Sequence, residues 1–146
     1  MRVVVLYESR TGNTRRAAEL IGGAAMDRGH EVAVRSVRDF DYKELALADA
    51  VFVGTWCDGA VLFGHRPGSG RRLSRLPVLD RKRAGVFLTY AIHSGRALPK
   101  LGRLVEALGA DVVAGRTYRR DRLGEGEAID SLVEAVLADA DVSSPA

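Results

Sequence analysis

The chain alternates between short apolar runs and longer stretches in which apolar residues recur every three or four positions. The short runs are rich in β-branched residues, as expected for strands that are buried on both faces. The longer stretches have the period of an amphipathic helix. The pattern predicts strands over 3–7, 31–37, 50–55, 84–89 and 111–114, the last with an extension to 118. It predicts helices over 13–28, around Leu45, and over 69–76, 98–108 and 129–137.

Five strands that alternate with helices imply a parallel sheet, because parallel strands need crossover connections. Right-handed crossovers place the helices on both faces of that sheet. The predicted fold is therefore a single doubly wound α/β domain over residues 1–141, followed by a frayed tail at 142–146. In such sheets ligands bind outside the carboxyl ends of the strands. The loops after the first, third and fourth strands are thus the places to look for a site.

Composition narrows the class of protein. The 146 residues are 47% hydrophobic and 28% charged, as is typical of soluble globular domains. No apolar run approaches the roughly 20 residues that cross a bilayer, so no membrane span is expected. The first residues lack the features of a secretory signal, and a cytoplasmic location is the expectation. The single cysteine, Cys57, excludes an internal disulfide and a cysteine-rich metal site, and no metal ligand is predicted.

The net charge of +3 is unevenly distributed. Residues 56–83, called the basic segment below, contain seven basic and two acidic residues, whereas the rest of the chain is slightly acidic. Such a concentration of positive charge steers anionic partners, and a solvated surface is the alternative interpretation. Binding to nucleic acid is not favoured, because the arginines lack interleaved aromatic residues and no nucleic-acid motif is present.

The loop after the first strand, called the first loop, concentrates groups that bind an anion. It reads ESRTGNT, with hydroxyls at Ser9, Thr11 and Thr14 and an amide at Asn13. Gly12 lets the backbone approach a ligand closely. The following helix adds free N–H groups and the positive end of its dipole. A helix cap is the alternative and would explain one of these positions, so the loop as a whole favours a phosphate.

Other phosphate-binding motifs do not fit the chain. There is no Gly-Lys pair for a nucleoside-triphosphate loop, and the nearest approach to a dinucleotide fingerprint, at 68–73, lacks the third glycine. A cysteine phosphatase would need a thiolate in the first loop, where none occurs. A receiver domain would need an acidic residue at the end of the third strand, where Thr55 stands.

The stretch SRTGNT is similar to the phosphate loop of flavodoxins, [ST]-x-T-G-x-T, and lies between the first strand and the first helix, as in that family. The resemblance covers nearly the whole chain. It implies a flavodoxin-like fold, a five-stranded parallel sheet in the order 2-1-3-4-5, of the short-chain type. It also implies FMN as the cofactor, with the phosphate bound by Ser9, Arg10, Thr11, Gly12, Asn13 and Thr14.

The other two loops extend the resemblance to the flavin ring. The stretch TWCDG is similar to a flavodoxin loop that reads Thr-Trp-Gly-Asp in some members. Trp56, the only tryptophan, offers a planar surface for stacking, and packing against the next helix is the alternative. Cys57 stands where several members of that family have glycine. In the family, the peptide bond after this residue turns over when the flavin is reduced. The resemblance implies ring contacts from Thr55, Trp56, Cys57, Asp58, Gly59 and Tyr90, with His93 either at the cofactor or exposed.

The resulting hypothesis is an FMN protein that transfers electrons through its bound flavin, without a catalytic acid–base residue. Its partner would be a redox protein or a quinone-like small molecule, and the basic segment favours an acidic one. A second hypothesis is an FMN-dependent oxidoreductase that acts on a quinone or a related substrate, as do the flavodoxin-like enzymes that oxidise protoporphyrinogen. A third is a binding module without flavin. The partner, the choice between carrier and enzyme, the reduction potentials and the oligomeric state stay open.

Overall fold

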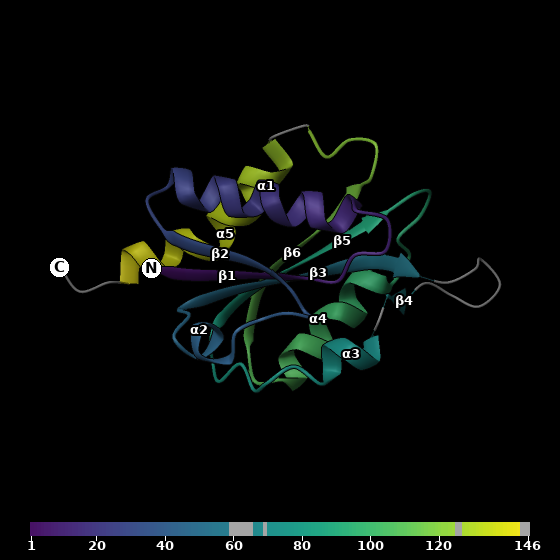
Figure 1. Cartoon of the computed structure of the whole chain (residues 1–146). Coiled ribbons are helices and arrows are strands. Elements are labelled where there is room, and N and C mark those ends of the chain that lie inside the picture. The colour runs from purple at the N-terminus through teal and green to yellow at the C-terminus, as the bar shows by residue number, and fades with distance from the viewer. Residues whose placement is uncertain (59–65, 69, 125–126, 144–146) are drawn as a thin grey trace.

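A parallel sheet runs through the middle of the protein and carries helices on both faces (Figure 1). The computed structural model describes residues 1–58, 66–68, 70–124 and 127–143. The elements, in chain order, are β1 (Arg2–Tyr7), α1 (Asn13–Asp27), β2 (Glu31–Ser36), α2 (Tyr42–Ala46), β3 (Ala50–Asp58), β4 (Arg66–Pro67), α3 (Gly70–Ser74), β5 (Arg83–Tyr90), α4 (Ala97–Ala107), β6 (Asp111–Arg119) and α5 (Glu127–Ser143).

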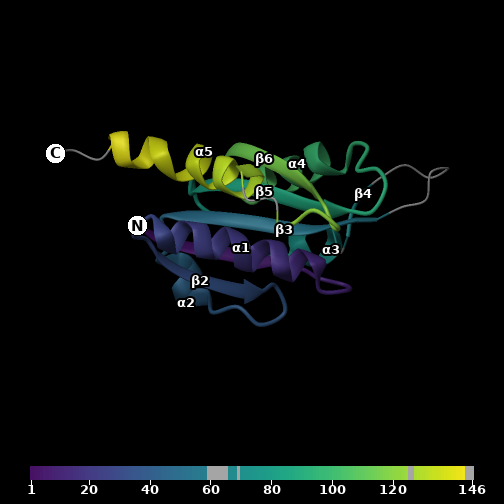
Figure 2. The ribbon, with the colours of Figure 1, turned by 90° about the horizontal axis from the view of Figure 1, so that it is seen from above.

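The five long strands are parallel and lie in the order β2-β1-β3-β5-β6. Numbering these strands alone gives 2-1-3-4-5, so the predicted fold class is confirmed. Helices α1 and α5 cover one face of the sheet, and α2, α3 and α4 lie on the other, as Figures 1 and 2 show. The strand order reverses between β1 and β3, and sheets of this kind bind ligands at the carboxyl edge of that reversal.

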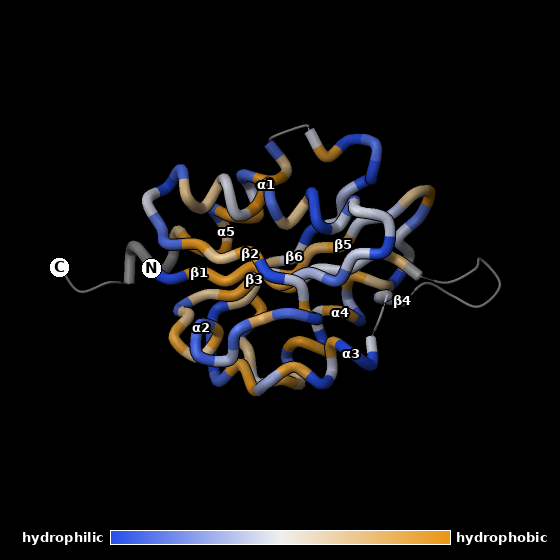
Figure 3. The backbone as a smooth tube through the Cα atoms, in the orientation of Figure 1, coloured by the Kyte–Doolittle hydropathy of each residue, from blue (hydrophilic) through white to orange (hydrophobic). Residues whose placement is uncertain are grey.

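Alternate residues of each strand face two separate cores. Val3 and Val5 of β1 pack with α1 and α5, whereas Val4 and Leu6 pack on the opposite face with α3 and α4. All four side chains are buried. Burial on both faces explains why the strands read as continuous apolar runs. In Figure 3 the hydrophobic colour is strongest along the strands, and polar colour returns toward the loops.

The third strand is longer than the sequence pattern predicts. We expected it to end at Thr55, but β3 continues to Asp58 and pairs in antiparallel fashion with β4, with Cys57 opposite Pro67. The parallel neighbours of β3 reach only to Gly54 on the β1 side and Trp56 on the β5 side. The last residues of β3 therefore lack a parallel partner, and the returning chain provides one.

The C-terminal elements also differ from expectation in their bounds. Strand β6 runs without interruption to Arg119, and its register against β5 shifts between Ala84 and Gly85, so Val113 forms a β-bulge. Helix α5 continues to Ser143, beyond the domain end expected at residue 141, and residues 144–146 lie outside the described part. Within the described ranges, no helix has both the length and the apolar character needed to cross a membrane.

Candidate functional site

A cavity of about 270 Å³ opens at the carboxyl edge of the sheet, where the loops after β1, β5 and β6 meet the end of β3. We call it the edge cavity. It lies beside the reversal of strand order between β1 and β3, the position at which ligands bind in this class of sheet. Its lining residues are Arg10, Thr11, Asn13, Trp56, Cys57, Thr89, Tyr90, Ala91 and Arg120.

The first loop is held in shape by its own polar groups. The Gly12 N–H donates to Ser9 Oγ at 3.0 Å, and Asn13 Nδ2 donates to Thr11 Oγ1 at 3.1 Å. Gly12 has φ +94°, a left-handed conformation that side-chain-bearing residues rarely adopt. Helix α1 begins directly after it, and no side chain in the described part of the chain caps that helix. The alternative explanation of these residues as a helix cap is therefore wrong, and the first N–H groups of α1 remain available to an anion.

Thr14 connects the first helix to β5 behind the loop. Its hydroxyl is buried and lies 2.9 Å from Thr89 Oγ1, 75 residues away in sequence. One of the two hydroxyls donates to the other, so the pair keeps one further O–H donor. Sequence reasoning missed Thr89, and the only available signal was a threonine at the end of an apolar strand.

Trp56 lies on a strand rather than in a loop, which corrects the expectation. Its indole packs over Gly68, where a Cβ atom would overlap the ring. The pairing is fixed by Gly68 N–H, which donates to Trp56 O at 2.7 Å, and by Thr55 Oγ1, which donates to Gly68 O at 2.8 Å. Trp56 Nε1 is buried and has no hydrogen-bond partner within the described residues. This nitrogen lies on the Gly68 side of the ring, so the indole edge is packed against β4 rather than turned to the cavity.

Cys57 and Tyr90 complete the lining on the far side of the cavity. Cys57 Sγ donates to Ser94 O at 3.6 Å, and the Cys57 backbone does not have a positive φ. Tyr90 is half-buried, and its carbonyl accepts from the Arg120 N–H at 2.9 Å, which brings the end of β6 to the cavity. Arg120 is a lining residue that sequence reasoning missed, because nothing local marks it.

Not every predicted site residue lines the cavity. Ser9, Gly12 and Thr14 are not lining residues: Ser9 and Gly12 bond to each other within the first loop, and Thr14 is buried. Thr55 is fully buried and bonds to Gly68 O. His93 is exposed and outside the lining set. The Asp58 backbone pairs with Arg66. Gly59 lies outside the described residues.

A buried carboxylate anchors the start of the first loop. Glu8 is only 2% exposed at its side chain, and Arg38 Nε donates to its Oε1 at 2.9 Å. Arg72 Nε lies 3.2 Å from Oε2 as an ion-pair contact without hydrogen-bond geometry. The Glu8 backbone N–H donates to Gly54 O at 3.0 Å, which fixes β1 against β3 at the edge of the sheet. Two guanidinium groups thus neutralise the one carboxylate next to the loop.

The sequence matches the family model described as a flavodoxin domain over residues 4–95, more than half of the chain. The chain belongs to the flavodoxin family. A flavodoxin from Aquifex aeolicus is 38% identical over 55 residues, which span 37% of this chain and 30% of that protein. The matched segment is therefore well under half of the curated relative.

Solved structures agree with this flavodoxin fold. The solution structure of two-electron reduced Megasphaera elsdenii flavodoxin has a TM-score of 0.76 at 23% identity, and the match covers 93% of this chain and 98% of that one. A flavodoxin from Streptococcus pneumonia TIGR4 gives 0.75 at 20% identity, with 95% and 99% coverage. Rubredoxin oxygen:oxidoreductase from Desulfovibrio gigas gives 0.75 at 19% identity over 98% of this chain but 37% of that one. At these identities the structures establish the fold.

FMN is the cofactor of the flavodoxin family, and the groups around the edge cavity of this flavodoxin fit it. The uncapped helix and the hydroxyls of the first loop suit a phosphate. Trp56 and Tyr90 supply aromatic surface on the same cavity. The cations of the lining are Arg10 and Arg120, so the described cations of the basic segment lie elsewhere.

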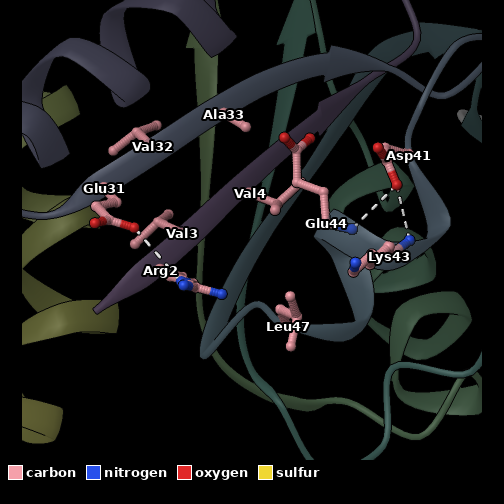
Figure 4. A pocket seen from close by; sticks show the side chains of 10 residues that line it. All are labelled: Arg2, Val3, Val4, Glu31, Val32, Ala33, Asp41, Lys43, Glu44 and Leu47. Atoms are coloured by element: carbon pink, nitrogen blue, oxygen red, sulfur yellow. Dashed lines mark hydrogen bonds and ion pairs between the residues drawn. The ribbon is translucent and has the colours of Figure 1, made fainter.

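A second hollow of this flavodoxin, about 380 Å³, lies at the opposite edge of the sheet, by the amino ends of β1 and β2 (Figure 4). Several of its polar groups are paired within the fold. Arg2 Nε is 3.5 Å from Glu31 Oε2, and Asp41 Oδ1 accepts from the backbone N–H groups of Lys43 and Glu44 at the start of α2. None of the predicted site residues lines this hollow.

Proposed function

We propose that this flavodoxin-family protein binds FMN in the edge cavity and transfers electrons through it to a redox partner. One observation carries the proposal: a single cavity joins Thr11 and Asn13 of the first loop to Trp56 and Tyr90. FMN supplies reversible electron uptake when bound, and the protein positions the ring and sets its surroundings. A cytoplasmic location, expected from the sequence, belongs to the same proposal.

The first loop would hold the phosphate. Thr11 and Asn13 face the cavity, and the N–H groups of the first turn of α1 lie beside them without a side-chain cap. These donors are already oriented by the bonds from Gly12 to Ser9 and from Asn13 to Thr11. A ligand therefore meets a preformed site and orders little chain on binding.

Trp56 and Tyr90 would flank the ring. The indole of Trp56 cannot tilt back toward β4, because Gly68 already occupies that side at van der Waals contact. Its outer face is thereby kept toward the cavity, where an aromatic ligand can stack on it. Gly68 thus positions Trp56 without being part of the lining.

The cavity favours a carrier over an enzyme that moves protons. Among the described residues that line it there is no carboxylate and no histidine. A reductase that protonates its substrate needs a positioned acid or base within hydrogen-bond reach. An electron carrier needs none. The absence of steady NAD(P)H or quinol turnover by the isolated protein is the expected result.

Titration with FMN tests the proposal directly, because Trp56 is the only tryptophan in the chain and its fluorescence reports the edge cavity alone. We expect quenching on addition of FMN, with one site per chain. Riboflavin, which lacks the phosphate, should bind more weakly. The variant Thr11→Val/Asn13→Ala should bind FMN about 10- to 100-fold more weakly, the loss of a charge-assisted bond or two, while its riboflavin affinity stays close to that of the native protein.

A second variant tests the ring end. Gly68→Ala places a methyl group where the Trp56 indole lies, so it should shift Trp56 emission and weaken FMN and riboflavin alike. Gly102→Ala is the matched control, because a Cβ atom there meets no neighbour within 4 Å. A protein that leaves Trp56 fluorescence unchanged at saturating FMN would refute the proposed site.

A further inference from the structure

A groove of about 490 Å³ lies between the chain that follows β2 and helix α3, and we call it the basic groove. Three arginines line it, namely Arg71, Arg72 and Arg75, together with the aromatic residues Phe40 and Tyr42. The aliphatic side chains of Val37 and Leu76 complete the lining. The basic groove therefore combines positive charge with aromatic surface in one depression.

Two of the arginines have no acidic partner in the fold. Neither Arg71 nor Arg75 forms an ion pair with any residue that the structure describes, and both side chains are exposed. They are four positions apart, a spacing at which like charges on a helical turn repel each other. No ion pair among the described residues therefore accounts for these two charges.

The third arginine is fixed in place. Arg72 contacts buried Glu8 through Nε, while Arg38 binds the other oxygen of the same carboxylate. This contact orients the Arg72 side chain along the wall of the groove. Because Glu8 is the first residue of the first loop, the basic groove adjoins the loop that borders the edge cavity.

Two aromatic residues lie beside these charges, Phe40 half-buried against the core and Tyr42 exposed. The Phe40 and Tyr42 rings lie 4.8 Å apart at a tilt of 55°, and Tyr42 is 70% exposed. Asp41, between them in sequence, caps α2 with its carboxylate and is not among the lining residues. Tyrosine, phenylalanine and arginine are the residues enriched at protein interfaces, where few side chains carry most of the binding energy.

We infer that the basic groove docks an acidic segment of the partner protein with which the flavin exchanges electrons; this inference rests on the proposed function. Charge complementarity selects the acidic segment, and the aromatic pair provides apolar contact for it. A nucleic acid is a poorer match, because the chain outside the basic segment is slightly acidic and offers no continuous basic track for a phosphate backbone. Docking here would place the partner beside the first loop and so near the edge cavity.

The test uses the FMN-loaded protein and a fluorescein-labelled ten-residue peptide of glutamate and aspartate with one central phenylalanine. The groove variant is Arg71→Gln/Arg75→Gln. The matched control, Arg81→Gln/Arg103→Gln, removes the same charge from exposed arginines outside the groove. We expect the groove variant to bind the peptide at least tenfold more weakly and the control less than threefold. FMN affinity and Trp56 quenching should stay unchanged in both variants.

A kinetic measurement extends the test to electron transfer. A reduced, small, acidic iron–sulfur protein passes one electron from its cluster, which is thereby oxidised, to the oxidised FMN of the loaded protein, and stopped-flow absorbance follows the decrease of the oxidised-flavin band. The groove variant should react several-fold more slowly than the control variant with this donor, and the difference should shrink at high salt. Both variants should react equally fast with dithionite, which needs no docking surface.

Three results would overturn the inference. Equal weakening of peptide binding in the two variants would show a general effect of charge. Tighter binding of a single-stranded oligonucleotide than of the peptide, lost in the groove variant alone, would assign the groove to nucleic acid. Loss of FMN in the groove variant would make it part of the cofactor site. If instead the native protein binds no FMN but still binds the peptide through the groove, the proposed function fails while the acidic docking site stands.

Discussion

Lys82 and Arg83 direct their side-chain donors to backbone carbonyls, whereas Arg71 and Arg75, earlier in the same basic segment, have no ion pair in the described fold. Lys82 Nζ donates to Ala46 O at 3.0 Å and to Ala48 O at 2.7 Å, which closes the turn between α2 and β3. Arg83 Nε donates to Val136 O at 2.9 Å and so ties β5 to α5. Arg71 and Arg75 thus face solvent at the basic groove, whereas Lys82 and Arg83 hold elements of the fold together.

The comparison shows that a run of charge in a sequence does not have one role. Both groups carry the same formal charge and lie within the same basic segment. What separates them is what the side chains reach: Lys82 and Arg83 donate to backbone carbonyls beside α2 and within α5, whereas Arg71 and Arg75 have no ion pair among the described residues. The free energy of unfolding should therefore depend on Lys82 and Arg83, and partner binding on Arg71 and Arg75.

Arg72 is the exception that tests this division most severely, because it belongs to the groove and also contacts Glu8. The variant Arg38→Met/Arg72→Met leaves the buried carboxylate without either cation. We expect its free energy of unfolding to fall by about 3–5 kcal/mol, as when a buried pair loses one side. Urea unfolding measures it. Adding Glu8→Gln should recover part of the loss, and a fall of less than about 1 kcal/mol in the double variant would contradict the assignment.

Lys82→Met should lower the free energy of unfolding by about 1–3 kcal/mol, because two carbonyls lose their charged donor. The same urea experiment measures it. Arg81→Gln is the control, since that side chain is exposed, and it should stay within about 0.5 kcal/mol of the native protein. Equal effects of the two substitutions would mean that this part of the segment stabilises by charge alone.

Tyr118, on β6 and outside the basic segment, provides a pH test. Burial raises the pKa of the Tyr118 phenol well above its ordinary value, although the positive charge of nearby Arg116 acts in the opposite direction. The unfolded phenol ionises first, so the free energy of unfolding falls as the pH rises above about 10. Tyr118→Phe loses the bond to Ala128 O but is free of this titration. Its stability deficit relative to the native protein should shrink by about 1 kcal/mol between pH 10 and pH 11. A constant deficit would contradict the shift.

The smallest effect belongs to the groove itself. Arg71→Gln/Arg75→Gln should leave the free energy of unfolding unchanged or raise it by about 0.2–0.5 kcal/mol, because a repulsion at helical spacing is removed. Thermal unfolding with and without 0.5 M salt checks the cause, since added salt should erase the gain. A loss of about 1 kcal/mol or more would place these arginines with Lys82 as structural residues.

The sequence was sufficient for the fold wherever burial is repeated along a strand. Val3 to Leu6 are buried on two faces, so a continuous apolar run is expected there, and β3 and β5 follow the same pattern, whereas the edge strands β2 and β6 are only partly buried. Strand β4 could not be found in this way. It is two residues long, contains Pro67, and exists only because β3 outruns its parallel neighbours.

The same limit applies to the edge cavity. Thr11, Gly12 and Asn13 are recognisable because their chemistry is concentrated in one loop. Thr89 reaches Thr14 across 75 positions, and Arg38 reaches Glu8 across 30, so these partners depend on the tertiary fold. Local patterns therefore find the centre of the site, and only the folded chain identifies the residues that support it.

Glu8 couples the edge cavity to the basic groove. It begins the first loop and contacts Arg72 of the basic groove, so a ligand that draws Arg72 away from Glu8 changes the forces that hold the loop. Linkage is reciprocal: the factor by which an occupied groove alters the dissociation constant of the cofactor must equal the factor by which the loaded cofactor alters affinity at the groove.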